Sequence, residues 1–187
     1  SILEMFDGVV EVRSSTGDNW LGGEDFLEVL IKDFESHCLP EGASGLSAPD
    51  RAQLRRKLEV AKCTLSTSPE VTLESIVPGQ LSPWHMTQDR FALLCEPLQQ
   101  RMRTPLERAV RDAKLKPSEI DEIVLVGGAS RMPMVVQMVT RMLGRLPLRH
   151  VNPDHAIALG AACAAGLRAR HQKLKEVVLT DVCPYTL

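Results

Sequence analysis

The amino-acid sequence predicts an α/β fold, and three observations support that prediction. Two apolar runs flank an Asp-Gly pair near the start of the chain, which is typical of a β-hairpin. Apolar residues recur at helical spacing through the middle of the chain. In the last third, short apolar runs alternate with helical patterns, which favours a sheet covered by helices. With 187 residues, 44% of them hydrophobic and 25% charged, the chain allows one large domain or two small ones.

The first predicted elements are a hairpin and a helix. Ile2–Met5 and Val9–Val12 predict two strands that are joined at Asp7-Gly8, and a turn follows at 16–19. From Glu24 the apolar period becomes helical, and the acidic first turn suits the positive end of the helix dipole. The predicted buried face consists of Phe26, Leu27, Leu30, Ile31 and Phe34.

A second helix is predicted after a loop at 40–45. Ser47-x-x-Asp50 resembles a capping box, and Pro49 is tolerated in a first helical turn. The predicted buried face of this helix consists of Leu54, Leu58, Ala61 and Leu65.

The middle of the chain predicts a strand, a turn and a further helix. Val71–Leu73, with Val77 as an additional candidate, predicts the strand, and Pro78-Gly79 predicts the turn toward its hairpin partner. A helix through Phe91–Met102 is expected to be interrupted at Thr104-Pro105, because this pair is typical of a helix start. The new or kinked helix is expected to end near Ala113.

The last third predicts strands in alternation with helices. Ile123–Val126 is a continuous apolar run, typical of a strand that is covered on both faces. A glycine turn at 127–131 leads to a helix over Met132–Leu143, with Gly144 at its end. Leu146–Val151 predicts a short strand, and Asn152-Pro153-Asp154 precedes a helix of small residues over Ala156–Ala169.

Composition excludes several classes of function. The net charge is −2, whereas a protein that neutralises nucleic-acid phosphates is normally basic. The longest uncharged apolar stretch, Ala156–Leu167, is too short to cross a bilayer, so no membrane partner is expected. The five cysteines form no CxxC pair and the histidines no ligand cluster, which indicates free thiols in a reducing cytoplasm and no metal site.

Three groups of residues could contact a small ligand. Gly127-Gly128 follows a predicted strand and precedes a helix, which allows backbone amides to approach a ligand. Glu59, Lys62 and Ser66 share one helix face, and Gly22-Gly23 precedes a helix. Taken alone, Gly127-Gly128 is better explained by a tight turn and Glu59 with Lys62 by a solvated ion pair, while Gly22-Gly23 is ambiguous. No arrangement of residues predicts a catalytic group.

Four motifs in order nevertheless resemble one family. They are Leu21-Gly22-Gly23-Glu24-Asp25-Phe26, Glu59-x-x-Lys62-x-Thr64-Leu65-Ser66, Leu125–Pro133 and Asn152-Pro153-Asp154 with the alanine-rich run to Ala162. Together they are similar to the DnaK-type heat-shock chaperones of the seventy-kilodalton class. The Ala162–Leu187 end resembles the HscC branch of that family. The resemblance extends over essentially the whole chain.

The resemblance implies an actin-like ATPase fold of which this chain is one lobe, the second. Residues 1–21 and 98–170 would form its base α/β subdomain, and 22–97 its upper α+β subdomain. Residues 171–187 would comprise the interdomain linker, at Glu176–Asp181, and the start of a peptide-binding domain. Both chain ends lack a lead-in or a polar tail, so we expect the sequence to be a piece of a longer protein.

The resemblance also implies a set of nucleotide-binding residues. Glu59 and Lys62 would contact the ribose hydroxyls, Ser66 the adenine edge, and Arg131 would stack on the base. The family usually has Arg in place of Cys63 and often Ser in place of Ala129, which puts adenine affinity in doubt. The full expected set is Gly22, Gly23, Glu59, Lys62, Ser66, Gly127, Gly128, Arg131 and Asp154.

The implied cofactor is ATP or ADP, with Mg²⁺ in the full-length protein. The family's phosphate hairpins, Mg²⁺-linked aspartates and catalytic lysine all precede Ser1, so this chain alone is not expected to hydrolyse ATP. The implied partners of the parent protein are unfolded or extended peptides, a J-domain co-chaperone and, as a further candidate, a nucleotide exchange factor, all in the cytoplasm. The alternatives are a non-catalytic interaction module with an actin-like fold, or another actin-fold ATPase such as a sugar kinase. The linker-like Val177–Asp181 disfavours the sugar kinase.

Overall fold

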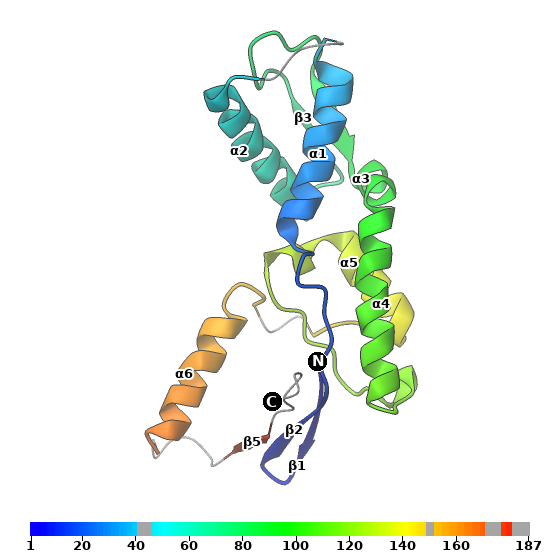
Figure 1. Cartoon of the computed structure of the whole chain (residues 1–187), viewed down its shortest axis with the longest axis vertical. Helices are drawn as coiled ribbons and strands as arrows, with labels where there is room; N and C mark the ends of the chain where they lie inside the picture. The colour runs from blue at the N-terminus through cyan, green and yellow to red at the C-terminus, as the bar shows by residue number, and fades with distance from the viewer. Residues whose placement is uncertain (41–45, 149–151, 171–176, 181–187) are drawn as a thin grey trace. The chain divides into compact units, whose positions relative to one another are not determined.

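The computed structural model describes residues 1–40, 46–148, 152–170 and 177–180. It is a mixed α/β structure with two small sheets, drawn in Figure 1. The chain divides into two compact units. Unit 1 contains Ser1–Asn19, Arg101–Ser130 and Val136–Leu187, and unit 2 contains Trp20–Gln100 and Arg131–Val135. Within the described ranges, no helix is both long and apolar enough to span a membrane.

Unit 1 contains a three-stranded sheet of order β1-β2-β5. Strands β1 (Ile2–Phe6) and β2 (Val9–Ser14) pair antiparallel, and β2 pairs parallel with β5 (Val178–Thr180). Asp7 and Gly8 join β1 to β2 at φ angles of 48° and 81°. Two successive positive φ angles are typical of the tight hairpin turns that match the twist of the strands, so the Asp-Gly prediction is confirmed.

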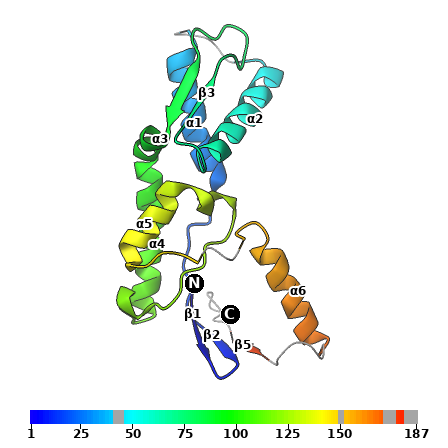
Figure 2. The same cartoon turned by 180° about the vertical axis from the view of Figure 1, so that it is seen from behind.

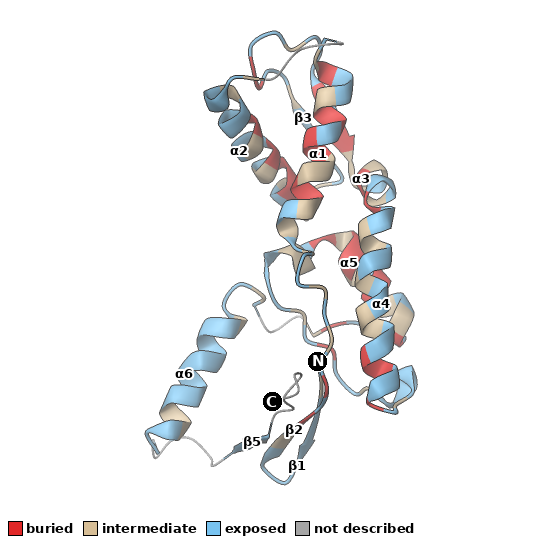
Figure 3. Cartoon of the chain, in the orientation of Figure 1, coloured by how far each residue is buried: buried red, intermediate tan, exposed pale blue. Residues whose placement is uncertain are grey.

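The core of unit 1 is formed mainly by helices. They are the part of α4 (Glu96–Asp112) after Gln100 and the part of α5 (Pro133–Leu143) after Val135, while the short η1 (Pro117–Glu119) has no buried residue. Val110, Ile123, Met138, Val139 and Leu143 form the buried cluster. Helix α6 (Ala156–Arg168) has no buried residue. Figure 3 therefore shows α6 almost entirely in the colour of exposed residues.

An extended segment after β2 is bound along α4. Ser14 Oγ donates to Ala109 O at 2.8 Å, and Thr16 Oγ1 donates to Pro105 O at 2.6 Å. Arg101 donates two hydrogen bonds to Asp18 Oδ2, at 3.0 and 2.8 Å. Alternate residues of the segment thus contact successive turns of the helix, because two extended residues and one helical turn span similar lengths. These bonds hold the chain just before the Gly22-Gly23 motif.

Unit 2 packs helices α1 (Gly23–Cys38), α2 (Ala48–Thr64) and α3 (Gln88–Leu94) with the hairpin of β3 (Glu70–Leu73) and β4 (Trp84–Thr87). Ser47 caps α2 by accepting a hydrogen bond from Asp50 N, as its sequence predicts. Figure 2 shows α1, α2 and β3 of this unit from behind. All nine residues predicted for the buried faces of the first two helices are buried: Phe26, Leu27, Leu30, Ile31, Phe34, Leu54, Leu58, Ala61 and Leu65.

Asp33 connects α1 to the rest of unit 2. Its carboxylate is buried and accepts hydrogen bonds from Trp84 Nε1 at 2.9 Å and from Arg90 at 2.6 Å. His37 lies one turn further along α1, with Nδ1 3.4 Å from the same carboxylate. On the exposed side, Arg55 of α2 pairs with Glu24 and Glu28 of α1. Because the two carboxylates stabilise the guanidinium cation, chiefly through the hydrogen bond that Arg55 donates to Glu28, the pKa of Arg55 is raised.

The predicted interruption at Thr104-Pro105 is wrong. The break lies at Cys95, and α4 then continues through Pro105. Pro97 in the first turn of α4 explains the restart, because proline is pre-organised for that position. Leu106, Ala109 and Val110 contribute to the unit 1 core, and burial of this face offsets the cost of an internal proline, about 3 kcal/mol.

Two predicted strands of the last third are not strands in the described residues. Among the described residues, Ile123–Val126 makes one backbone hydrogen bond, from Leu148 N to Ile123 O at 2.8 Å, and Val124 and Val126 are exposed. An extended segment becomes a strand only where a neighbour pairs with it. Leu146–Leu148 is irregular, and the rest of that predicted strand, 149–151, lies outside the described residues. The described residues of the last third therefore contain helices α5 and α6 without these two expected strands.

Smaller differences concern two loops. Strand β3 ends at Leu73, and Val77 is buried in the connection to β4, where Gly79 has a φ of 77°. Most of the predicted loop at 40–45 lies outside the described residues, as do 171–176 and 181–187 of the predicted linker and peptide-binding segment.

Candidate functional site

The nine predicted site residues are divided between the two units. Unit 2 contains Gly22, Gly23, Glu59, Lys62, Ser66 and Arg131, and unit 1 contains Gly127, Gly128 and Asp154. Each group has its own local geometry.

Lys62 is the centre of the unit 2 group. It is buried in spite of its charge, and its Nζ donates to Gly23 O at 2.9 Å. The same Nζ lies 2.7 Å from Glu59 Oε2, one turn earlier on α2. A buried ammonium needs such partners, because an unpaired charge is costly to remove from water. The structure therefore brings Gly23, Glu59 and Lys62 together at the start of α1.

Glu59 pairs with Lys62 through one oxygen and stays partly open to solvent. Oε2 lies 2.7 Å from Lys62 Nζ, while 43% of the Glu59 side chain is exposed. Cys63 Sγ donates a weak hydrogen bond to the other oxygen, Oε1, at 3.7 Å. A carboxylate that is partly exposed can accept a further hydrogen bond from a ligand hydroxyl.

Gly22 lies just before α1, and Ser66 lies just after the end of α2. Gly22 N donates to Asp25 Oδ2 at 2.7 Å, which closes the first turn of α1. A Cβ built on Gly22 would meet nothing within 4 Å, so the fold alone does not require glycine there. Ser66 is half-buried just after α2, and its N–H donates to Cys63 O at 3.0 Å.

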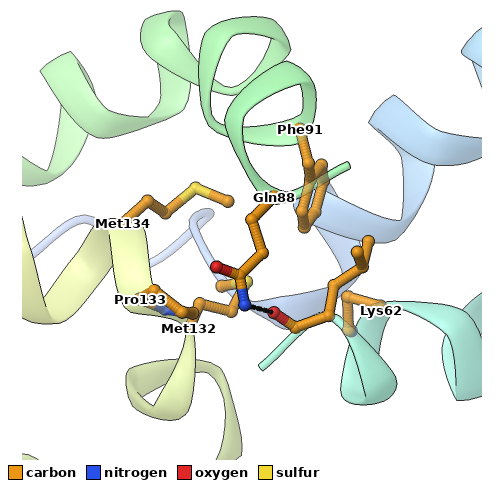
Figure 4. Close-up of a pocket in the computed structure, with 7 residues that line it drawn as sticks. Lys62, Gln88, Phe91, Met132, Pro133 and Met134 are labelled. Atoms are coloured by element: carbon orange, nitrogen blue, oxygen red, sulfur yellow. Dashed lines mark hydrogen bonds between the residues drawn. The ribbon is translucent and has the colours of Figure 1, made fainter. Parts of the chain in front are cut away.

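An apolar pocket in unit 2 adjoins Lys62, and its empty volume is about 220 Å³ with the open mouth included. Figure 4 shows Gln88 between Phe91 on one side and Met132 and Pro133 on the other. Gln88 Nε2 donates to Leu65 O at 2.9 Å and to Ser68 O at 3.0 Å. The lining residues are Lys62, Leu65, Gln88, Phe91, Met132, Pro133 and Met134. Since Met132 follows Arg131 directly, the pocket wall includes one site residue and the neighbour of another.

The unit 1 group is a glycine turn beside an acidic loop. Gly127 has a φ of 91°, a conformation that favours glycine, and its N–H donates to Pro153 O at 3.0 Å. The short helix η2 (Gly128–Arg131) begins here, and Ser130 donates to Gly127 O. A Cβ built on Gly128 would lie 3.6 Å from Asp154 Oδ1, which is ordinary contact. The structure thus places Gly128 and Asp154 side by side.

Two cysteines of unit 2 are chemically protected. Burial raises the pKa of the Cys95 thiol to about 12, and it also raises the pKa of Cys38. Cys63 and Cys163 are exposed cysteines. In the described part of the chain, no group of three or more His, Cys, Asp or Glu residues could hold a metal ion.

Comparison with known proteins identifies the family. The family model described as Hsp70 protein matches residues 1–187, the whole chain. This chain belongs to the Hsp70 family. It is 41% identical to the chaperone protein DnaK 1 of a Synechococcus strain, 39% to DnaK of Thermus thermophilus and 40% to dnaK of Guillardia theta. Each match covers 100% of this chain but only 26%, 32% and 31% of the respective relative.

This Hsp70 chain thus spans about a quarter to a third of the length of the curated relatives it matches. The family resemblance found in its four motifs is therefore confirmed, while the HscC branch stays a prediction. Sequence reasoning missed the pocket residues Gln88, Met132 and Met134. Met132 and Met134 flank the proline of the Leu125–Pro133 motif. This position beside a family motif was the signal that could have indicated their place in the pocket wall.

Proposed function

We propose that this Hsp70 chain is the second lobe of an actin-like nucleotide-binding domain and contributes the adenosine side of an ATP or ADP site. One observation carries the proposal above all. Lys62 bonds Gly23 O at the start of α1 and pairs with Glu59, whose carboxylate is partly exposed beside it. A ribose hydroxyl would donate a hydrogen bond to that carboxylate.

The remaining site residues receive roles that fit their chemistry. Arg131 would stack its planar guanidinium on adenine, and Ser66 would bond the edge of the base. Gly128 would lie close to the nucleotide, and Asp154 would face it. Because Gly22 and Gly127 have no side chain, their backbone would approach the nucleotide closely.

The two units correspond well to the two subdomains expected from the family. Unit 1 would be the base subdomain, expected at 1–21 and 98–170, and unit 2 the upper subdomain, expected at 22–97. Two boundaries of the units, at Asn19 and Gln100, support this assignment. Segment Arg131–Val135 belongs to unit 2 although its chain neighbours belong to unit 1.

Strand β5 would be part of the interdomain linker. The pairing of β5 with β2 supports this role, because strand addition lets a short segment bind through backbone hydrogen bonds. In the full-length protein, the linker would couple ATP hydrolysis, with Mg²⁺, to the binding of unfolded peptides in the cytoplasm. A J-domain co-chaperone and a nucleotide exchange factor would be its partners.

The test compares ribose recognition by two variants. We expect adenosine to bind the chain with a Kd of about 1 mM, near −4 kcal/mol, without hydrolysis of ATP. If Glu59 contacts the ribose, 2′,3′-dideoxyadenosine should bind several-fold more weakly, and Glu59→Gln should reduce that preference. Glu74→Gln, on the exposed surface of the same unit, serves as the control. The measurement is an NMR titration that follows the amides of Gly23 and Gly128.

The non-catalytic interaction module is retained as a second candidate because of Cys63. This residue stands beside Glu59 where the family usually has arginine, so one cation expected at the base is missing. A titration without any adenosine-dependent shift would contradict nucleoside binding and favour that candidate. Equal affinity for adenosine and its dideoxy analogue would contradict only the role of Glu59.

A further inference from the structure

The loop before α6 contains a side-chain bond that shapes the backbone beside Gly127. Asn152 Oδ1 accepts a hydrogen bond from Asp154 N at 3.0 Å, an arrangement in which asparagine closes its own turn. The backbone oxygen of Asn152 accepts from His155 N at 3.1 Å and from Ala156 N at 3.0 Å, where α6 begins. One residue thus fixes both the turn and the helix start.

The turn is tied directly to the glycine segment. Pro153 O, inside the turn, accepts the hydrogen bond from Gly127 N at 3.0 Å. Asp154, at the end of the turn, lies against Gly128. Gly127 in turn accepts the hydrogen bond from Ser130 Oγ at 2.7 Å, so the connection continues into η2. The conformation of residues 152–154 therefore determines where both Gly127 and the Asp154 carboxylate lie.

We propose that Asn152 is a positioning residue for nucleoside binding. It acts through Pro153 and Asp154 and holds Gly127 and Gly128 in the conformation that the ligand contacts. The proposal rests on the proposed function of Gly128 and Asp154. Loss of the side-chain oxygen would remove the hydrogen bond to Asp154 N, and Pro153 O would then hold Gly127 N less firmly.

The experiment uses a graded series of variants at this position in the full 187-residue chain. Asn152→Asp keeps an oxygen that accepts the bond, Asn152→Ser keeps a weaker one, and Asn152→Ala has none. We expect adenosine affinity to fall about five-fold in Asn152→Ala, to fall about two-fold in Asn152→Ser and to stay close to the original in Asn152→Asp. Amide hydrogen exchange of Gly127 should accelerate in the same order. Asn19, the other asparagine of the chain, is exposed, and Asn19→Ala is the matched control. It should change neither the adenosine affinity nor the exchange of Gly127.

The two readouts separate this proposal from the proposed function. If the unaltered chain does not bind adenosine, the nucleoside site fails, while Gly127 exchange still tests whether Asn152 holds the turn. Unchanged affinity in Asn152→Ala would overturn the positioning role, as would loss of affinity in Asn152→Asp equal to that in Asn152→Ala. If Asn152→Ala does not fold, the ratio between the serine variant and the original chain decides, and a ratio of one overturns the proposal.

Discussion

Unit 2 buries its large side chains, whereas unit 1 exposes much of its apolar surface. In unit 2, Phe34, Leu58 and Trp84 are almost completely inaccessible to solvent. In unit 1, Met5 of the sheet is 79% exposed and Ile157 of α6 is 72% exposed. Burial of apolar area is the main favourable contribution to folding, so each unit should have a different share of the stability.

The difference follows from how the elements cover one another. In unit 2, α1, α2, α3 and β4 each contain buried apolar residues, and Asp33 adds polar links between α1, β4 and α3. In unit 1, the buried cluster lies between α4, α5 and Ile123, and the sheet and α6 contribute little to it. We therefore infer that unit 2 unfolds at higher denaturant concentration than unit 1.

The largest effect is expected from removing a buried leucine in each unit. Leu54→Ala in unit 2 should lower the free energy of unfolding by about 3 to 4 kcal/mol, because the cavity cannot collapse in a fully packed core. Leu143→Ala in unit 1 should cost about 2 kcal/mol, since its neighbours are partly exposed. Both tryptophans, Trp20 and Trp84, belong to unit 2, so urea unfolding followed by fluorescence reports on that unit, and hydrogen exchange reports on unit 1. Equal costs would contradict the comparison.

A smaller effect is expected at the buried carboxylate of unit 2. Asp33→Asn should lower the free energy of unfolding by about 2 kcal/mol, because the amide can accept only part of the hydrogen bonds from Trp84 and Arg90 and lacks the charge that faces Arg90. Glu35→Gln, on the same helix, is the control and should have little effect. The measurement is again urea unfolding, and a cost below that of the control variant would show that Asp33 does not hold the unit together.

The sequence was most informative where local signals and packing agree. The helical spacing of Leu54 and Leu58, the cap at Ser47 and the Asp7-Gly8 hairpin all predicted the observed structure. Prediction failed where tertiary contacts decide. Pro105 marks a helix start by its local pattern, yet packing of α4 carries the helix through it. Ile123–Val126 has the composition of a strand, but strand formation needs a partner that no local pattern reveals.

The candidate site was predictable only as a list of residues. Helical spacing alone placed Glu59 and Lys62 on one face, and that ion pair is observed. Spacing could not reveal that Lys62 bonds Gly23 across two helices, nor that Pro153 bonds Gly127. Both bonds use a backbone atom of a segment distant in the sequence, and such an atom leaves no compositional signal.

The pH dependence of stability should differ between the buried and exposed thiols. The folded-state pKa of Cys95 is raised from 9.0 to about 12 by burial, so the unfolded chain releases this proton first as the pH rises. Its contribution is therefore fully present below pH 9 and is lost progressively up to about pH 12. Between pH 8 and 10, Cys95→Ala should lose less stability than the original chain, by on the order of 1 kcal/mol. Cys163→Ala, at an exposed thiol of unit 1, is the control, and identical pH profiles for all three proteins would contradict the assignment.

The smallest effect is expected at strand β5 in unit 1, and it concerns association more than stability. Val178 N donates to Gly8 O at 3.0 Å, and Val178 is itself 54% exposed, so the strand is bound mainly through its backbone. Val178→Pro removes that donor, whereas Val178→Thr keeps it and serves as the matched control. We expect Val178→Pro to lower the melting temperature by no more than a few degrees.

The same variant tests whether β5 pairs within one chain or between chains. Pairing within one chain covers the edge of β2, and an uncovered edge is a template for another strand. Val178→Pro, or deletion of residues 175–187, should then leave self-association unchanged or raise it slightly in sedimentation velocity at several concentrations. If β5 instead adds to the β2 strand of a neighbouring molecule, the original chain should form a weak dimer, and both changes should abolish it. A dimer that is lost in Val178→Pro but kept in Val178→Thr would therefore show that β5 pairs with β2 of a second chain and not with β2 of its own.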